Sequence, residues 1–354
     1  MTPQALLDGL EARQTSALAR AISLVENGTA GFEDLLASLH PRLGRARRIG
    51  VTGPPGAGKS TLIERLTSAL RSAGLSVGVV AVDPSSPFTG GALLGDRIRM
   101  ERSSLDDGVF IRSMASRGSV GGMATTTGEV ADVMDAFGFD RILIETVGVG
   151  QSELDVAAAA DSTVVVLVPE SGDGIQVMKA GLMEIADVFV VNKADRPGAD
   201  HLRQELEVAL GLRAGQAFRH VRAHHGRTGG PADGKDAKDR PPAPPSVRPP
   251  EWEPPVLATI ASKGEGVTEL IAALDRHFEL WQASGRLEER RRRRMVVRTK
   301  DVIDRAVRRW VWANGQQEEM DAVLKDVSAG QRSPYEAAAN VVARLNGSEA
   351  YGRR

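Results

Sequence analysis

The chain has 354 residues, no cysteine and a formal net charge of −1 at pH 7. Hydrophobic residues make up 42% of it but aromatic residues only 4%, as is typical of an α/β core of Val, Leu, Ile and Ala. The balanced charge gives no global argument for binding nucleic acid or membranes, and the lack of cysteine removes the usual soft-metal sites. Without a signal-peptide pattern or an apolar run of transmembrane length, we expect a cytoplasmic protein.

Periodicity divides the chain into regions. Apolar residues recur at three- and four-residue intervals through residues 1–44, which predicts a helical N-terminal extension. Apolar strand candidates then alternate with helical segments, at 48–52, 76–82, 109–112, 141–144, 163–168 and 188–191. This alternation predicts an α/β fold with a mainly parallel sheet, helices on both faces, and a ligand at the carboxyl ends of the strands.

Residues 53–60, GPPGAGKS, fit the pattern G-x-x-x-x-G-K-[ST] of the loop that holds the phosphates of a nucleoside triphosphate. A predicted strand precedes the loop, and an amphipathic helix follows it with its positive end toward the phosphates. Lys59 can reach the β- and γ-phosphates, and Ser60 can offer its hydroxyl to Mg²⁺. The alternative is a glycine-rich turn before a helix. The predicted phosphate-binding residues are Gly53, Pro55, Gly56, Ala57, Gly58, Lys59, Ser60 and Thr61.

Asn192, Lys193 and Asp195 form an NKxD pattern at the end of the predicted strand 188–191. A carboxylate at Asp195 can accept hydrogen bonds from N1–H and the 2-amino group of guanine, whereas adenine offers an acceptor at N1 and no 2-amino group. Because an unpaired buried carboxylate is costly, the pattern favours GTP and GDP over ATP. Taken alone, the same pattern also occurs in helix-capping loops.

Residues 141–151, RILIETVGVGQ, combine a buried strand with a carboxylate at its end and a glycine shortly after it. Glu145 is expected to hold Mg²⁺ directly or through water, and the Gly148 N–H to meet the γ-phosphate, so that hydrolysis releases the following segment. Glu is longer than the usual Asp, which favours a water-mediated contact. Val149 stands where a catalytic Gln would follow the glycine, and the nearest Gln is Gln151. We therefore expect slow intrinsic hydrolysis.

Three further motifs resemble the MeaB/ArgK group, the methylmalonyl-CoA mutase-associated GTPases: VDPSSP at 82–87, GGALLGDRIRM at 90–100 and ETVGVGQSE at 145–153. The resemblance runs from about residue 48 to 195 and resumes near 256. It implies a P-loop GTPase that gates cofactor delivery to an adenosylcobalamin-dependent acyl-CoA mutase and protects that mutase from inactivation. It also implies Mg²⁺ near Asp83, Asp96 and Glu145. The predicted metal set is Ser60, Asp83, Asp96 and Glu145, and the predicted catalytic set is Lys59, Asp96 and Glu145.

The chain departs from the family pattern at two places. The usual LGDKTRM is LGDRIRM here, so Arg97 and Ile98 replace Lys and Thr. The guanine-closing loop begins with Ile260 where Ser is common but keeps Ala261, whose N–H can approach guanine O6. The predicted guanine-loop residues are Ala261, Ser262 and Lys263.

Local structure offers alternatives for some of these motifs. They are a turn at Asp83 and a helix cap at Asp96, and neither excludes a metal contact. Residues 171–179, SGDGIQVMK, resemble the family's nucleotide-responsive loop, with an ordinary strand-to-helix connection as the alternative.

The predicted GTP-binding domain spans 45–285 and includes a mobile Pro/Gly-rich insertion at 213–255, whose histidines we interpret as solvated. Residues 286–354 form a predicted helical arm that opens with the basic run 290–294. Acidic and apolar neighbours of this run favour an amphipathic helix over a nucleic-acid-binding segment. The resemblance implies that the arm forms a homodimer, with contacts from Trp310, Val311, Trp312 and Tyr335.

Two other functions stay open. A metallocentre-maturation GTPase of the hydrogenase or urease type would share the phosphate loop and the guanine motif but should carry Cys or His metal motifs. A P-loop kinase should accept ATP and place a base beside an acceptor pocket. No sequence feature indicates direct cobalamin binding, and methylmalonyl-CoA, isobutyryl-CoA and related mutases are all possible clients.

Overall fold

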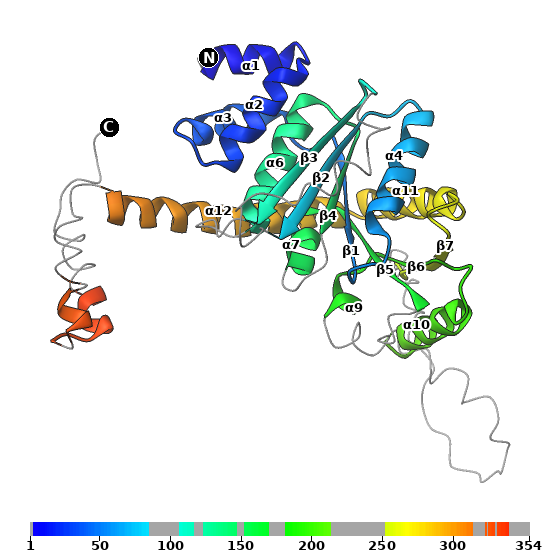
Figure 1. Cartoon of the computed structure of the whole chain (residues 1–354). Coiled ribbons are helices and arrows are strands. Elements are labelled where there is room, and N and C mark those ends of the chain that lie inside the picture. The colour runs from blue at the N-terminus through cyan, green and yellow to red at the C-terminus, as the bar shows by residue number, and fades with distance from the viewer. Residues whose placement is uncertain are drawn as a thin grey trace, which may run out of the picture. The chain divides into compact units, whose positions relative to one another are not determined.

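The structure, a computed structural model, describes residues 3–84, 106–116, 123–146, 152–169, 181–213, 252–313, 323, 325–329 and 331–339 (Figure 1). The chain forms two compact units, residues 1–295 and 296–354. The second unit begins within helix α12 (Arg286–Ala313), and further helical residues follow at 325–328 and 334–339. The predicted arm, 286–354, therefore starts inside the first unit.

A seven-stranded sheet with the order β3-β2-β4-β1-β5-β6-β7 forms the centre of the first unit. All neighbouring strands pair in parallel, which confirms the predicted α/β class. Six strands were predicted, whereas β7 was not. The strands are β1 (Arg47–Thr52), β2 (Val77–Pro84), β3 (Val109–Ser116), β4 (Arg141–Thr146), β5 (Ser162–Leu167), β6 (Val188–Asn192) and β7 (Val256–Thr259).

Successive side chains of a strand point to opposite faces of the sheet and so pack into different hydrophobic cores. On β5, Val164 and Val166 pack with α4 (Lys59–Ser72) and α11 (Val267–Ala283), whereas Val165 and Leu167 pack with α9 (Leu182–Ile185) and α10 (Ala199–Arg213). Figure 1 shows α4 and α11 on one side of the sheet, with α6 (Met123–Phe137) and α7 (Ser152–Ala159) on the other. Because both faces are covered, the strand ends are where a ligand can bind.

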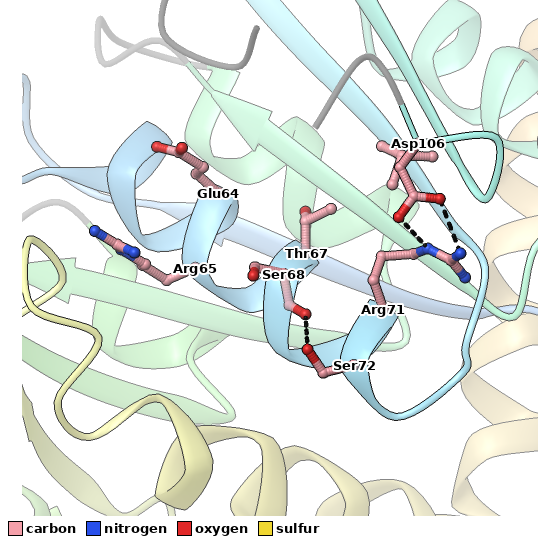
Figure 2. Close-up of a pocket in the computed structure, with 8 residues that line it drawn as sticks. Glu64, Arg65, Thr67, Ser68, Arg71, Ser72 and Asp106 are labelled. Atoms are coloured by element: carbon pink, nitrogen blue, oxygen red, sulfur yellow. Dashed lines mark hydrogen bonds and ion pairs between the residues drawn. The ribbon is translucent and has the colours of Figure 1, made fainter. Parts of the chain in front are cut away.

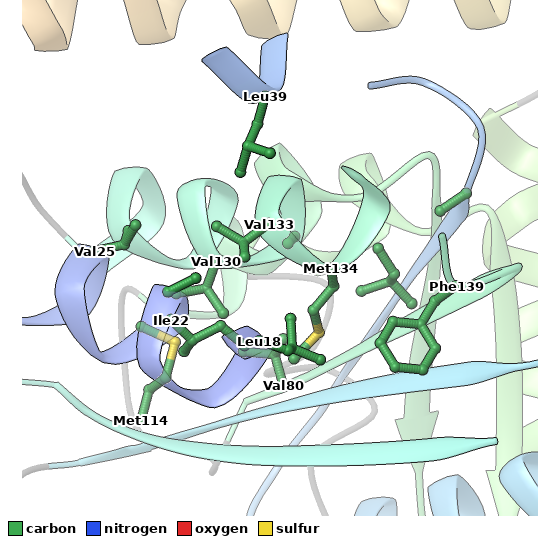
Figure 3. Packing of buried hydrophobic residues seen from close by; sticks show 14 of the residues in the cluster. Leu18, Ile22, Val25, Leu39, Val80, Met114, Val130, Val133, Met134 and Phe139 are labelled. Carbon is green, nitrogen blue, oxygen red and sulfur yellow. The ribbon is translucent and has the colours of Figure 1, made fainter. Parts of the chain in front are cut away.

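The N-terminal extension is helical, as predicted. It contains α1 (Pro3–Glu11), α2 (Thr15–Glu26), α3 (Phe32–Leu39) and the short 3₁₀ helix η1 (His40–Arg42). Leu18 and Ile22 of α2 pack against Val130 and Met134 of α6, in a cluster that continues to Val80 of β2 (Figure 3). The extension is thus part of the core of the first unit.

An ion network lies at the amino-terminal edge of the sheet, opposite the end that carries the phosphate loop. The buried carboxylate of Asp161, just before β5, accepts hydrogen bonds from Arg291 (2.6 and 3.0 Å), Arg294 (3.0 Å) and the Arg48 backbone N–H (3.1 Å). The Arg48 guanidinium, itself buried, contacts Asp132 at 2.7 Å and Asp135 at 3.0 Å. These bonds join the start of the phosphate-loop strand to α12.

A second aspartate repeats this arrangement beside β6. The Asp187 carboxylate accepts from the Thr163 backbone N–H (2.8 Å) and from Arg290 (2.8 Å), and His277 Nε2 lies 3.3 Å away. Arg292 and Arg293 instead pair with Glu289 on the same helix. Three of the five arginines of the basic run are therefore directed at the sheet, and this part of α12 belongs to the first unit.

These contacts make the stability depend on pH. Burial by itself raises the pKa of Asp161, but the hydrogen bond from Arg291 and the positive charges of Arg294 and Arg48 lower it to about 2, against an ordinary value of 3.8. A carboxylate with a depressed folded pKa stabilises the fold above its unfolded pKa, and that contribution is lost as the pH falls through the folded pKa. For Asp161, the loss therefore develops below about pH 4 and approaches completion near pH 2.

We expect Asp161 to account for about 2 kcal/mol of the free energy of unfolding that disappears on acidification. Asp161→Asn should be less stable than the wild type at pH 7, and its stability should fall less steeply below pH 4. Urea unfolding between pH 7 and pH 2.5 measures both quantities. Asp106→Asn is the matched control, because Asp106 also pairs with an arginine but lies at the surface. Equal slopes for Asp161→Asn and wild type would contradict the assignment.

Candidate nucleotide-binding site

The phosphate loop runs from the end of β1 into the first turn of α4. Gly53 has φ +137°, and a Cβ there would lie 2.1 Å from the Val166 carbonyl oxygen, so only glycine fits at this position. Gly58 has φ +84°, and a Cβ would lie 2.5 Å from Asn192 Nδ2. The two glycines let the loop pass close to β5 and to the NKxD segment. The predicted strand, loop and helix are all present.

Lys59 lies inside the curve of this loop. Its side chain is buried, and Nζ donates to the carbonyl oxygens of Gly53 (2.7 Å) and Pro54 (3.0 Å). The charge is therefore held at the loop by its own backbone. A phosphate bound there would meet a cation that is already in position.

Ser60 and Glu145 come together from distant parts of the sequence. Ser60 Oγ donates to Glu145 Oε1 at 2.7 Å, and the Glu145 side chain is buried. Glu145 pairs in register with Val51 of β1 and Ala81 of β2, so it lies near the carboxyl end of β4, the strand between β1 and β2. A hydroxyl and a carboxylate in this arrangement are the oxygen ligands that Mg²⁺ prefers, and they match two of the four predicted metal ligands.

Asn192 connects the phosphate loop to the guanine-closing loop. Its Nδ2 donates to the Ala57 carbonyl oxygen at 2.8 Å, while its Oδ1 accepts from Thr259 Oγ1 (3.1 Å) and the Ala261 N–H (3.0 Å). The Asn192 side chain is buried, and both ends of its amide group are hydrogen-bonded. We interpret Asn192 as the residue that sets the spacing between the two loops.

The predicted base-reading residues flank this connection. Lys193 has φ +56°, a strained value for a residue with a side chain, and the next N–H, that of Ala194, donates to the Thr259 carbonyl oxygen at 3.0 Å. Asp195 is exposed, as are Ser262 and Lys263, whereas Ala261 is buried. The structure thus brings 192–195 and 259–263 together at one end of the sheet. The Ala261 N–H, predicted to approach guanine O6, donates to Asn192 here.

Several predicted site residues cannot be placed. Asp96, Arg97, Gly148, Gln151 and residues 171–179 lie outside the described residues. For Asp83 the structure gives the backbone, which pairs in register with Ala115 at the end of β2. This position lies on the same edge of the sheet as Glu145, because Ala81 and Glu145 are register partners.

A cavity outside the candidate site lies beside α4. It has a volume of about 410 Å³ and lies along the outer side of the helix, and Figure 2 shows part of its lining. It contains none of the predicted nucleotide-binding residues and is therefore separate from the candidate site. Within the described part of the chain, no group of three or more His, Cys, Asp or Glu side chains could hold a metal ion.

The family model described as methylmalonyl Co-A mutase-associated GTPase MeaB matches residues 18–316. The chain belongs to the MeaB family. A Pyrococcus abyssi protein named as a GTPase is 42% identical over 342 residues, 97% of this chain and 96% of that protein. The mitochondrial methylmalonic aciduria type A homolog of Mus musculus is 33% identical over 351 residues, 94% of this chain and 77% of that protein.

The fold of the chain also resembles that of a solved structure. The crystal structure of an LAO/AO transport system kinase has a TM-score of 0.63 and 27% identity, and the match covers 98% of both chains. The MeaB resemblance and the P-loop fold predicted from the motifs are thereby confirmed. None of the helices in the described ranges combines the length and apolar character needed to cross a membrane.

Arg65 is a residue near the site that the sequence did not reveal. It lies on α4, and its guanidinium donates to the backbone of the guanine-closing loop at Ala261 and Ser262. In the sequence it occupies an ordinary solvent-facing position of an amphipathic helix. No motif marks it, because its partners lie near the other end of the nucleotide domain.

Proposed function

We propose that this MeaB family member binds and hydrolyses GTP and acts as a chaperone of an adenosylcobalamin-dependent acyl-CoA mutase. The observation that carries the nucleotide part is that Asn192 connects the phosphate loop to the loop at Ala261, while the Ser60–Glu145 pair lies at the end of the same phosphate loop. The phosphate loop with Lys59, the Ser60–Glu145 pair and the loop at Ala261 are held at one edge of the sheet. Family membership supports GTPase activity.

Guanine is the base that the exposed carboxylate of Asp195 suits. Asp195 lies shortly after Asn192, which is hydrogen-bonded to the phosphate loop and to the guanine-closing loop. These two loops would lie on either side of a nucleotide. An acceptor pair at that position complements N1–H and the 2-amino group, and adenine leaves it unpaired. GTP and GDP are therefore the proposed ligands.

Mg²⁺ fits the oxygen ligands at the phosphate end. Ser60 and Glu145 would hold it, with Asp83 and Asp96 as further proposed ligands, and it would neutralise charge on the β- and γ-phosphates. The chain's own contribution is the placed cation of Lys59 and the loop N–H groups that orient the phosphates. With Val149 rather than Gln after Gly148, we expect the attacking water to be poorly oriented and turnover to be slow.

The mutase is the partner that the family description supports. Methylmalonyl-CoA mutase is part of the name of the family, and a relative is named after methylmalonic aciduria. The proposed chaperone couples its nucleotide state to the mutase through residues near Asp96 and 171–179. Because such coupling is reciprocal, the GTP and GDP states should differ in mutase affinity.

The C-terminal arm is proposed to form a homodimer. Within the second unit, α12 exposes apolar side chains at Val296, Val297, Ile303 and Val307. Tyr335 is 87% exposed, Val311 is half-buried, and the side chains of Trp310 and Trp312 lie outside the described part of the structure. Exposed apolar residues on one long helix support a second copy as the partner.

We expect a cognate adenosylcobalamin mutase to accelerate steady-state GTP turnover at least about tenfold, because partner contacts would order the hydrolytic groups. Phosphate release is measured with and without the mutase, and complex formation is confirmed by light scattering, which also gives the mass of the free chain. Lys59→Ala with the same mutase is the control for background hydrolysis. Unchanged turnover in a demonstrated complex would exclude gating, and a monomeric mass would exclude the dimer.

A kinase is the alternative that the solved relative's name raises. It predicts transfer of phosphate from labelled ATP to an acceptor, with GTP inert. That result would overturn the GTPase proposal, whereas hydrolysis of GTP without any transfer to an acceptor would support it.

A further inference from the structure

We infer that Arg65 is a positioning residue that holds the guanine-closing loop against the phosphate helix and thereby slows nucleotide release. The inference rests on the proposed GTP-binding function and adds to it a residue outside every nucleotide motif. Arg65 Nε donates to the Ala261 carbonyl oxygen at 3.2 Å, and Nη2 donates to the Ser262 carbonyl oxygen at 2.8 Å. One planar guanidinium thus binds two successive carbonyls of the loop.

These two bonds add a second connection between the guanine-closing loop and the segment formed by the phosphate loop and α4. Ala261 donates its backbone N–H to Asn192 Oδ1, and its carbonyl oxygen accepts from Arg65 Nε. Asn192 in turn donates to Ala57 in the phosphate loop, and that loop leads directly into α4, which carries Arg65. The guanine-closing loop is therefore joined to the phosphate loop through Asn192 and to α4 through Arg65.

The loop needs an external support because its outer part is exposed. Ser262 and Lys263 are exposed, and the internal bonds of the loop are backbone contacts. The N–H groups of Lys263 and Gly264 donate to the Ile260 carbonyl oxygen, Gly264 N–H also donates to the Ala261 carbonyl oxygen, and Ile260 N–H donates to the Glu265 carbonyl oxygen. These bonds shape the turn but do not fix it to α4. Among the side-chain contacts of the described residues, those of Asn192 would then be the remaining ones that join the turn to the phosphate loop if the Arg65 guanidinium were absent.

Arg71 provides a matched control on the same helix. It makes a bidentate pair with Asp106 and donates to the Leu75 carbonyl oxygen. Figure 2 shows Arg65 and Arg71 extending from α4 in opposite directions along the cavity, with Arg71 meeting Asp106. Both arginines make side-chain hydrogen bonds that leave α4, those of Arg71 being the more numerous, but only Arg65 contacts the guanine-closing loop in the described structure.

The test is the rate at which a fluorescent GDP analogue leaves the wild type and the variants Arg65→Met, Arg65→Lys and Arg71→Met. We expect Arg65→Met to release GDP about tenfold faster and to raise KM for GTP, with kcat within about twofold because Lys59 and Ser60 are intact. Arg65→Lys should be intermediate, since an ammonium cannot bind both carbonyls in the same fork. Arg71→Met should release GDP at the wild-type rate even if its thermal stability falls.

The outcomes separate the inference from the proposed function. If the wild type binds GDP but Arg65→Met releases it at the wild-type rate, the positioning role is wrong and the GTP-binding proposal stands. Equal acceleration in Arg65→Met and Arg71→Met would show a general effect on α4 and would also overturn the role. A wild type that binds GDP no better than ADP overturns the proposed function and this inference together.

Discussion

Lys59→Ala should lower GTP turnover by about a hundredfold or more, because it removes the cation that neutralises charge developing on the β- and γ-phosphates. The structure makes this expectation specific. Nζ is held at the loop by the Gly53 and Pro54 carbonyl oxygens, so the charge is positioned at the loop that is predicted to bind the phosphates. Single-turnover phosphate release at saturating GTP and Mg²⁺ measures the effect on the chemical step.

Ser60→Ala should give a loss of similar size, since the hydroxyl beside Glu145 would no longer be available to a metal ion. Ser68→Ala is the matched control, because Ser68 is an exposed serine on the same helix. Circular dichroism and thermal unfolding check that each variant keeps the fold. Turnover near the wild-type rate in Lys59→Ala would mean that the loop has a structural role only.

Asp195→Asn should change the preference between GDP and XDP by about a hundredfold or more in favour of XDP. In the proposed site, the carboxylate would accept two hydrogen bonds from guanine, whereas the amide would accept one from N1–H and donate one to the 2-oxygen of xanthine. Asp195 is exposed at the end of the segment that Asn192 fixes, so the substitution should leave the loop connections intact. Calorimetry with GDP, XDP and ADP measures the change.

Asp200→Asn serves as the control for this change, since Asp200 is an exposed aspartate in the first turn of α10. It should keep the wild-type order, with GDP bound at micromolar affinity or better and ADP far more weakly. Equal affinity of the wild type for GDP and ADP would exclude guanine recognition by Asp195. An unaltered GDP preference in Asp195→Asn would exclude it as well.

The family and the nucleotide motifs could be predicted from the sequence because each is a run of neighbouring residues. The chemistry of the phosphate loop is contained within residues 53–60, where the glycines, Lys59 and Ser60 are separated by short fixed steps of the backbone. Strands buried on both faces of a parallel sheet are continuous apolar runs, which is why six of seven strands were predicted. β7 has only four residues, with one buried, so its apolar signal is short and weak.

The role of the basic run 290–294 depended on contacts that local sequence cannot show. An amphipathic helix was predicted from the flanking residues, but the partners of Arg290, Arg291 and Arg294 are Asp187 and Asp161, more than a hundred residues earlier. Each aspartate was an ordinary residue beside a predicted strand. Only the sheet places them at one edge, where burial alone would raise the pKa of Asp161 but the hydrogen bond from Arg291 and the charges of several arginines lower it to about 2.

By itself, the sequence determined which chemical groups the chain carries and in what order along the strands they occur, because those properties are local. Tertiary structure decided which groups meet: Ser60 with Glu145, Asn192 with both loops, and Arg65 with the Ala261 carbonyl. The physical reason is that parallel strands bring their carboxyl ends to one edge, whatever their separation in sequence. Hydrogen bonds then form between residues that are close in space but whose separation in sequence follows no regular spacing.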